Sequence, residues 1–158
     1  MKKMILPLGL FLFLVVPLSS MAAEPDAILG VWWNQEKDAH IELYKCGEEY
    51  CGKIVWLKEP NYPEGSKDGV PGTPKLDHNN SDPALRKTPV IGLQIVYGLS
   101  YAGDDRWKGG KIYDPKNGKT YRCTLSLDKR GNMKLRGFIG ISLIGRNSFW
   151  TRVTDTEP

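Results

Sequence analysis

The polar residues whose spacing suggests chemistry lie in one stretch of the chain. Asp77, Asn80 and Asp82 fall within six residues, and Arg86 follows them. Calcium would need about six to eight oxygen ligands, and this stretch lacks the glycine and the terminal glutamate of an EF-hand loop. We therefore predict no metal site. We expect the Asp and Asn side chains to cap backbone amides and Arg86 to pair with a carboxylate, an arrangement that could also orient a polar ligand group.

Signals for catalysis are weak elsewhere in the sequence. With only two histidines in the chain, a zinc site would have to borrow carboxylates or thiols. The glycines at the two ends of residues 140–145 are one place too far apart for a nucleophile elbow. A hydrolase that uses Asp77 and Asp82 with Tyr113 stays open, because paired carboxylates are recognised by their separation in space. We name no catalytic residue and no cofactor, and the sequence leaves enzyme activity undecided.

The cysteines predict one disulfide. Cys46 and Cys51 flank a four-residue link suited to a hairpin, and opposite hairpin positions bring Cβ atoms within the roughly 3.5–4.5 Å that a disulfide requires. The alternative is two separate buried thiols. Cys123 lies on the inward face of a predicted strand, and we expect it to remain a free thiol.

The first 23 residues have the pattern of an export signal. Lys2 and Lys3 precede an apolar run over residues 5–18, and small residues at 20–23 offer a cleavage site. The run is shorter than the roughly 20 residues of a membrane span, and no cysteine follows it to carry a lipid. We expect a mature chain of residues 24–158 in the periplasm or the medium, without a stable membrane anchor.

Composition limits the mature chain to a single domain. About 135 residues fit one hydrophobic core. Without Lys2 and Lys3, 20 Lys and Arg residues stand against 18 Asp and Glu residues, so the mature net charge is about +2. Acidic residues interrupt almost every basic stretch, and no basic cluster alternates with aromatics. We expect no nucleic-acid partner.

Hydrophobic periodicity indicates strands. Ala39, Ile41 and Leu43 share one face of an alternating segment, and residues 120–127 alternate in the same way. The predicted strands are 29–33, 39–45, 50–57, 90–97, 109–114, 120–127, 133–139 and 148–153. Short polar turns between them favour antiparallel neighbours, and closure removes the exposed edges. We predict an all-β, up-and-down barrel of about eight strands; the alternative is a two-sheet sandwich.

One long segment, residues 58–89, has no period of either kind and is rich in Pro, Gly, Asp, Asn and Lys. A loop of this length is typical of a functional cover or of a solvated insertion. Residues 81–86 predict a short helix, with Ser81 or Asp82 as its cap and Pro83 in its first turn.

Short motifs follow one another in a fixed order along the chain. They are Gly30-Val31-Trp32, Cys46-Gly47, Cys51-Gly52-Lys53-Ile54-Val55-Trp56, Asp77-x-x-Asn80-x-Asp82-x-x-Leu85-Arg86, Pro89-x-x-Gly92-Leu93, Trp107-x-Gly109-Gly110-x-Ile112-Tyr113-Asp114-Pro115-x-Asn117-Gly118-x-x-Tyr121, Arg136-Gly137-Phe138-Ile139-Gly140 and Leu143-x-Gly145-Arg146-x-x-x-Trp150. Over nearly the whole mature chain, the sequence resembles the exported bacterial family called domain of unknown function 2147. The resemblance implies a lipocalin-like (calycin) antiparallel barrel and no established activity.

The calycin resemblance also implies an architectural pair. In that pattern the Trp of a Gly-x-Trp motif on the first strand plugs one barrel end, and an Arg from the last strand stacks over it. Trp32 and Arg152 would be this pair.

The expected function follows from the expected barrel. An eight-stranded barrel is either packed or holds one small ligand. Glycines at 92, 98, 109, 110, 137 and 140 would free space, while apolar walls with polar tips would come from four aromatic residues: Trp56, Tyr97, Tyr113 and Phe138. We predict a carrier or sensor of a small apolar or amphiphilic ligand, with loop 58–89 governing access. The alternatives are an envelope structural or interaction module with a filled barrel, in which the glycines serve bulges, and a carboxylate-dependent hydrolase.

Overall fold

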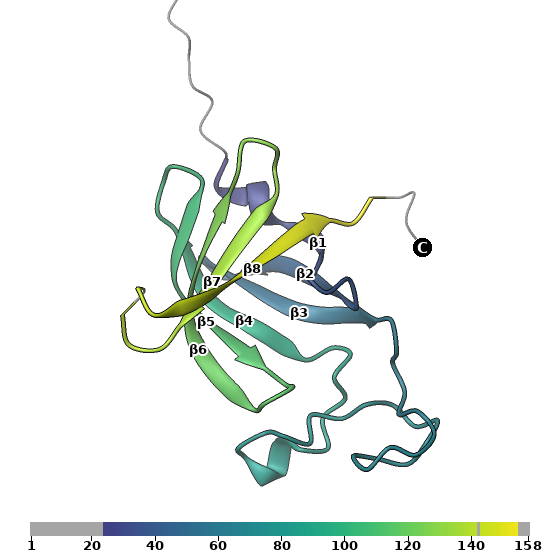
Figure 1. Ribbon diagram of the computed structural model, residues 1–158. Helices are drawn as coiled ribbons and strands as arrows, with labels where there is room; N and C mark the ends of the chain where they lie inside the picture. The colour runs from purple at the N-terminus through teal and green to yellow at the C-terminus, as the bar shows by residue number, and fades with distance from the viewer. Residues whose placement is uncertain (1–23, 142, 155–158) are drawn as a thin grey trace, which may run out of the picture.

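The chain folds into a closed barrel of eight antiparallel strands. A computed structural model describes residues 24–141 and 143–154, so the predicted export signal lies outside the described residues. Each strand pairs with its neighbours in sequence, and β1 pairs with β8 to close the barrel (Figure 1). The up-and-down barrel is confirmed, and the two-sheet alternative is wrong.

The strands follow the predicted order closely. They are β1 (Gly30–Trp33), β2 (Ala39–Cys46), β3 (Glu49–Leu57), β4 (Gln94–Tyr101), β5 (Arg106–Asp114), β6 (Lys119–Leu127), β7 (Met133–Phe138) and β8 (Gly145–Arg152). Two 3-10 helices accompany them, η1 (Pro25–Ile28) before β1 and η2 (Pro83–Leu85) in the long loop. Asp82 caps η2 by accepting a hydrogen bond from the Ala84 amide, as predicted.

Strands β4, β5 and β8 differ most from their predicted bounds, and β8 starts at Gly145, three residues before its predicted start. Residues 90–93 were expected within β4, but they form a tight connection in which the Gly92 amide donates to the Ile54 carbonyl. Strand β5 starts three residues before its predicted start at Gly109. The register of β5 against β6 shifts between Trp107 and Gly110, and Gly109 has a φ of +81° there. This bulge interrupts the alternation by which a strand is recognised in a sequence.

The topology gives the barrel two distinct ends. One end of the barrel, which we call the open end, carries the loops that follow the odd-numbered strands: 34–38, 58–93, 115–118, and the described residues 139–141 and 143–144. Helix η1 and the turns at 47–48, 102–105 and 128–132 lie at the other, which we call the closed end (Figure 1).

Two tryptophans fill the closed end, and one arginine stacks over the first of them. Trp32 and Trp107 are fully buried, and their indole nitrogens donate to the carbonyls of Ile28 (2.9 Å) and Pro25 (3.1 Å) in η1. The Arg152 guanidinium lies 4.3 Å from the centre of the Trp32 ring and donates to the Leu29 carbonyl at 2.9 Å. The expected pair is therefore present, and helix η1 is tied across this end as a lid.

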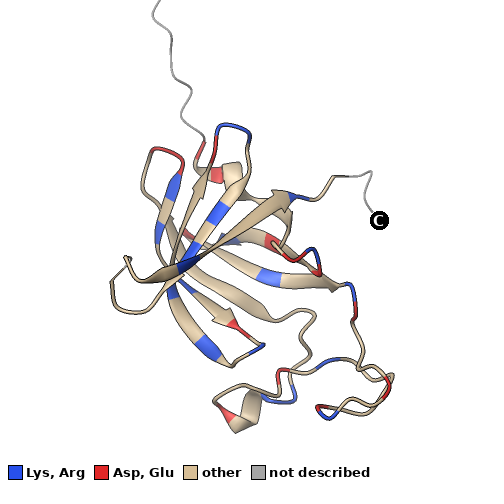
Figure 2. Ribbon diagram, in the orientation of Figure 1, with Lys and Arg blue, Asp and Glu red and all other residues tan. Residues whose placement is uncertain are grey.

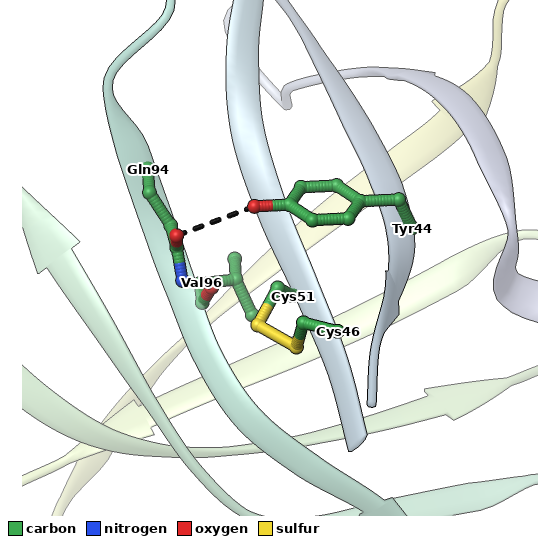
Figure 3. Close-up of a disulfide and its surroundings, with 5 residues drawn as sticks. All are labelled: Tyr44, Cys46, Cys51, Gln94 and Val96. Atoms are coloured by element: carbon green, nitrogen blue, oxygen red, sulfur yellow. Dashed lines mark hydrogen bonds between the residues drawn. A yellow bond between two sulfur atoms is a disulfide. The ribbon is translucent and has the colours of Figure 1, made fainter. Parts of the chain in front are cut away.

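A disulfide joins β2 to β3 at the closed end. Cys46 and Cys51 are bonded, with their Cα atoms 5.8 Å apart (Figure 3). Nearby, the Tyr44 hydroxyl of β2 donates a hydrogen bond to the Gln94 side-chain oxygen of β4 at 3.2 Å. The prediction of this bond is confirmed. Cys123 is a buried free thiol, and burial raises its pKa to about 12. No helix of the described residues has the length and apolar character to span a membrane.

Candidate functional site

The barrel interior is filled near the closed end and hollow towards the open end. A cavity of about 1610 Å³ extends from the interior out between the open-end loops. Its inner wall comes from the inward faces of six strands and is apolar: Ile41, Ile54, Ile112, Tyr121, Leu135 and Trp150. These side chains provide a site suited to the apolar part of a ligand.

Gly137 on β7 borders this cavity. A Cβ atom built at Gly137 would lie 3.8 Å from its nearest neighbours, which is ordinary contact. A Cβ atom at the inward-facing Gly110 would lie only 2.6 Å from Leu99. The other glycines expected to free space have positive φ angles and serve bends and bulges: Gly92, Gly98, Gly109 and Gly140. Only Gly137 of that set therefore adds room to the cavity.

The rim of the cavity carries charges of both signs. Five cations and five carboxylates border it: Lys58, Lys67, Lys75, Lys116 and Arg146, and Glu36, Asp38, Glu59, Asp68 and Asp114. Two ion pairs form among them, Lys75 with Glu59 at 3.5 Å and Lys116 with Asp38 at 3.3 Å. Lys58, Lys67 and Arg146 make no ion pair with any described carboxylate, so they can meet an anionic group.

Asp38 is held in its charged form across the rim. Burial alone acts to raise its pKa, but the hydrogen bond from the Asn34 amide and the charge of Lys116 outweigh burial, and the pKa is lowered. This carboxyl group is therefore ionised at neutral pH and is a poor proton donor.

The long loop between β3 and β4 is tied to itself by backbone pairs. Isolated bridges join Asn61 to Pro74 and Leu76 to Pro89. Tyr62 is 6% exposed and accepts a hydrogen bond from the Leu76 amide at 3.0 Å. Residues from both ends of this loop border the cavity, so the loop covers part of the open end.

Asp77 anchors the loop to the barrel. Its carboxylate is fully buried and accepts hydrogen bonds from the Tyr113 hydroxyl on β5 (2.6 Å) and the Asn80 side chain (2.7 Å). Burial and the neighbouring carboxylate both raise the pKa of Tyr113, which keeps the hydroxyl protonated as the donor. Because both Asp77 oxygens are occupied by partners within the chain, we interpret Asp77 as an anchor for the loop.

Arg86 corrects one sequence prediction. Its Nε donates to the Asn80 carbonyl at 2.8 Å, and no ion pair with a described carboxylate forms. The reason is local competition: the Asp77 carboxylate is taken by Tyr113 and Asn80, and Asp82 caps η2. Arg86 therefore fixes the backbone of the loop.

The loop also contacts the turn between β5 and β6. The Asn79 side chain donates to the carbonyls of Pro115 (3.2 Å) and Lys116 (3.1 Å). A Cβ atom at Gly118 would lie 1.9 Å from the Asn79 carbonyl oxygen, so only glycine allows this approach. The segment at 114–118 is thus a turn, as its sequence predicted, and it supports the covering loop.

The structure separates the eight predicted ligand-binding residues. Tyr113 and Phe138 border the cavity. The other six do not, namely Trp56, Asp77, Asn80, Asp82, Arg86 and Tyr97. Tyr97 is 39% exposed, and its hydroxyl donates to the Gln94 carbonyl.

Trp56 lies outside the cavity because of a β-bulge. Ile41 pairs with Ile54, but the preceding His40 pairs with Trp56, so one residue of β3 is left over. The extra residue puts Ile54 and Trp56 on opposite faces of the strand. Trp56 consequently stacks on His40, with ring centres 4.5 Å apart, and meets the edge of Trp33 at 5.4 Å.

Sequence reasoning did not name the aliphatic residues of the cavity wall as ligand contacts. Ile41 and Leu135 carried a signal, since each occupies an inward position of an alternating strand. Alternation marks a core position, but it does not distinguish a packed position from one that faces a hollow. Among the described residues, no group of three or more His, Cys, Asp or Glu is placed to hold a metal ion.

Comparison with known proteins supports this architecture. The model of a family described as "Uncharacterized protein conserved in bacteria (DUF2147)" matches residues 30–152. Among solved structures, Protein HP1028 from the human pathogen Helicobacter pylori, described as belonging to the lipocalin family, is similar with a TM-score of 0.66. The two chains are 22% identical over 81% of this chain and 84% of that chain, which shows a shared fold. A search of curated proteins gave no match.

Proposed function

Because this chain belongs to the bacterial family DUF2147, whose description names no activity, we propose its function from the barrel cavity. The protein binds one small apolar or amphiphilic molecule in the open half of a lipocalin-like barrel. It does so after export, and the Cys46–Cys51 disulfide is consistent with an oxidising compartment.

The continuity of the cavity carries this proposal. An apolar wall that includes Ile54, Ile112 and Leu135 leads without interruption to a charged rim. Burying apolar ligand surface against such a wall contributes roughly 25 cal/mol for each Å² removed from water. The rim lets a polar head group stay hydrated or pair with Lys58, Lys67 or Arg146. The cavity therefore suits an amphiphile whose apolar part points inward.

The positions of the carboxylates favour binding over hydrolysis. The five carboxylates that border the cavity lie at its rim, and the inner wall is formed by hydrocarbon and aromatic groups. Asp77 and Asp82 do not form a catalytic pair, because the first is bonded to Tyr113 and the second caps η2. A wholly filled barrel does not fit the open half, although it describes the closed half.

A graded substitution at Gly137 tests the proposal. Trp150 borders the cavity, so long-chain fatty acids or environment-sensitive apolar dyes should change the tryptophan fluorescence of the mature protein saturably. Gly137→Leu adds a side chain to the hollow and should weaken binding by about tenfold or more. Gly137→Ala adds one methyl group in ordinary contact and should change affinity by less than about threefold.

Two results would overturn the proposal. One is failure of every apolar ligand tested to bind saturably. The other is equal affinity of the wild-type and Gly137→Leu proteins when both have the same melting midpoint. A third variant then tests access: replacing residues 63–71 with a short Gly-Ser link keeps the backbone pair between Tyr62 and Thr73. This variant should speed both ligand entry and release if the loop covers the entrance.

A further inference from the structure

The hairpin between β7 and β8 exposes an unusual amount of apolar surface. Four of its side chains are large, aliphatic and solvent-facing, with exposed fractions between 61% and 84%: Ile139, Ile141, Leu143 and Ile144. We call these four side chains the apolar tip. A contiguous exposed group of this kind marks an interaction surface in most proteins.

Two arginines hold the hairpin from behind. Arg122 on β6 donates to the Gly140 carbonyl at 3.4 Å, and Arg136 on β7 donates to the Leu143 carbonyl at 3.1 Å. A second Arg136 nitrogen donates to the Asn147 side chain at 2.8 Å. The backbone of the hairpin is therefore bound by two guanidinium groups. The aliphatic side chains of the apolar tip lie outermost, and the positive charges lie behind them.

The charge of the barrel is concentrated on the same side. Strands β5 to β8 carry nine Lys and Arg residues and a single carboxylate, Asp114, whereas β1 to β4 carry two of each sign. The nine cations are Arg106, Lys108, Lys111, Lys119, Arg122, Lys134, Arg136, Arg146 and Arg152. Figure 2 shows blue bands distributed along the length of strands β5 to β8.

We propose that the apolar tip docks the open end of the barrel onto an anionic lipid bilayer. The four aliphatic side chains enter the boundary between head groups and acyl chains, and the exposed cations in the open-end parts of β5 and β6, Lys111 and Lys119, face lipid phosphates. This layered order matches a bilayer surface, in which hydrocarbon lies beneath a negatively charged layer. An acidic protein would match the cations but offers no reason for a protruding aliphatic tip.

Docking in this way bears on access to the cavity. Ile139, Ile144 and Arg146 border the cavity, so a docked hairpin brings the cavity entrance to the membrane surface. An amphiphile could then pass between the bilayer and the barrel without crossing bulk water. The docking proposal itself does not depend on ligand binding, because Ile141 and Leu143 lie outside the cavity wall.

Vesicle co-sedimentation of the mature protein tests the docking. Vesicles of phosphatidylglycerol and phosphatidylethanolamine should bind the protein, with the bound fraction falling as salt is raised. Vesicles of phosphatidylcholine alone should bind at least about fivefold less. The double variant Ile141→Asn, Leu143→Asn should lose about tenfold or more of the affinity for anionic vesicles.

A matched control removes apolar surface elsewhere. Val70 and Leu85 in the long loop are 68% and 48% exposed, and Val70→Asn with Leu85→Asn should leave vesicle binding within about twofold of wild type. Lys111→Gln with Lys119→Gln, in the open-end parts of β5 and β6, should weaken binding and flatten its salt dependence.

The outcomes separate docking from ligand binding. Loss of vesicle binding in the tip variant, with fatty-acid affinity and melting midpoint unchanged, supports docking. Equal vesicle binding by the tip variant and wild type would overturn it. Absence of vesicle binding by the wild type would also overturn it. If light scattering then shows a wild-type dimer that the tip variant has lost, the apolar tip serves self-association.

Discussion

The two ends of this barrel use the same strands for opposite purposes. At the closed end, Trp32 and Trp107 fill the interior, and η1 seals it through two indole hydrogen bonds. At the open end, shorter aliphatic side chains and Gly137 leave a hollow. Strand pairing is continuous through both halves, so it does not explain the difference. The comparison teaches that the packing of η1 against large side chains determines which part of a small barrel is filled.

The contacts that stabilise the two ends also differ in strength. The closed end has a disulfide and the Arg152 contact with Trp32. The open end relies on the hydrogen bonds of Asp77 and on ion pairs at the rim. We therefore expect the closed end to carry most of the stability and the open end to tolerate change. Four predictions follow from this difference.

The largest effect is expected at Trp32. Trp32→Ala removes a fully buried ring and its hydrogen bond to Ile28, and it should lower the free energy of unfolding by about 3–5 kcal/mol. Chemical denaturation monitored by far-UV circular dichroism measures the loss. Trp56→Ala, on the outer face, is the control and should cost clearly less. An unchanged denaturation midpoint in Trp32→Ala would contradict the view that the closed end carries most of the stability.

A matched leucine pair sharpens the contrast. Leu99→Ala empties a packed position, whereas Leu135→Ala enlarges a hollow that already exists. Leu99→Ala should cost about 2–5 kcal/mol, and Leu135→Ala should fall at or below the lower end of that range, because less new cavity surface is created. Urea denaturation of both variants measures the difference. Equal losses would mean that the interior near Leu135 is as tightly packed as that near Leu99.

The sequence predicted the solid half of the molecule better than the hollow half. The barrel and the Cys46–Cys51 bond follow from alternation and hairpin spacing, which are local patterns, and the calycin resemblance implied the contact of Arg152 with Trp32. The candidate site depended on knowing which face each residue takes. The bulge in β3 leaves one residue of that strand unpaired and turns Trp56 outward. Alternation assumes a fixed period of two, so it could not reveal this reversal.

The hollow itself was beyond sequence reasoning. Whether an inward isoleucine packs or borders a cavity depends on the volumes and rotamers of residues from several strands. The glycines illustrate this: Gly110 and Gly137 look alike in the sequence, yet one contacts Leu99 closely and the other faces open space. The prediction that Arg86 pairs with a carboxylate was wrong for a similar reason. Competition for the Asp77 carboxylate exists only in the folded loop.

A smaller effect is expected from the disulfide. The Cys46–Cys51 bond closes a very short loop, so Cys46→Ser with Cys51→Ser should lower the free energy of unfolding by about 2 kcal/mol. Because the bond lies at the closed end, fatty-acid affinity should stay unchanged in the folded variant. Thermal unfolding and ligand titration of the same preparation measure both quantities. A selective loss of affinity would show that the closed end shapes the cavity.

The smallest effect is expected from Asp38 at the rim. Its pKa in the folded protein is lowered, so its contribution to stability is present above the pKa of the unfolded chain and is lost as the pH falls through the folded pKa. The side chain is 42% exposed, and solvent screening limits this contribution to about 0.5 kcal/mol. An NMR titration of the carboxyl group should give a midpoint below 3.8, and Lys116→Gln should move it upward. A midpoint at or above 3.8 would contradict the rim contact. A low midpoint with a small contribution to stability would instead fit a rim whose ion pairs are weak surface contacts.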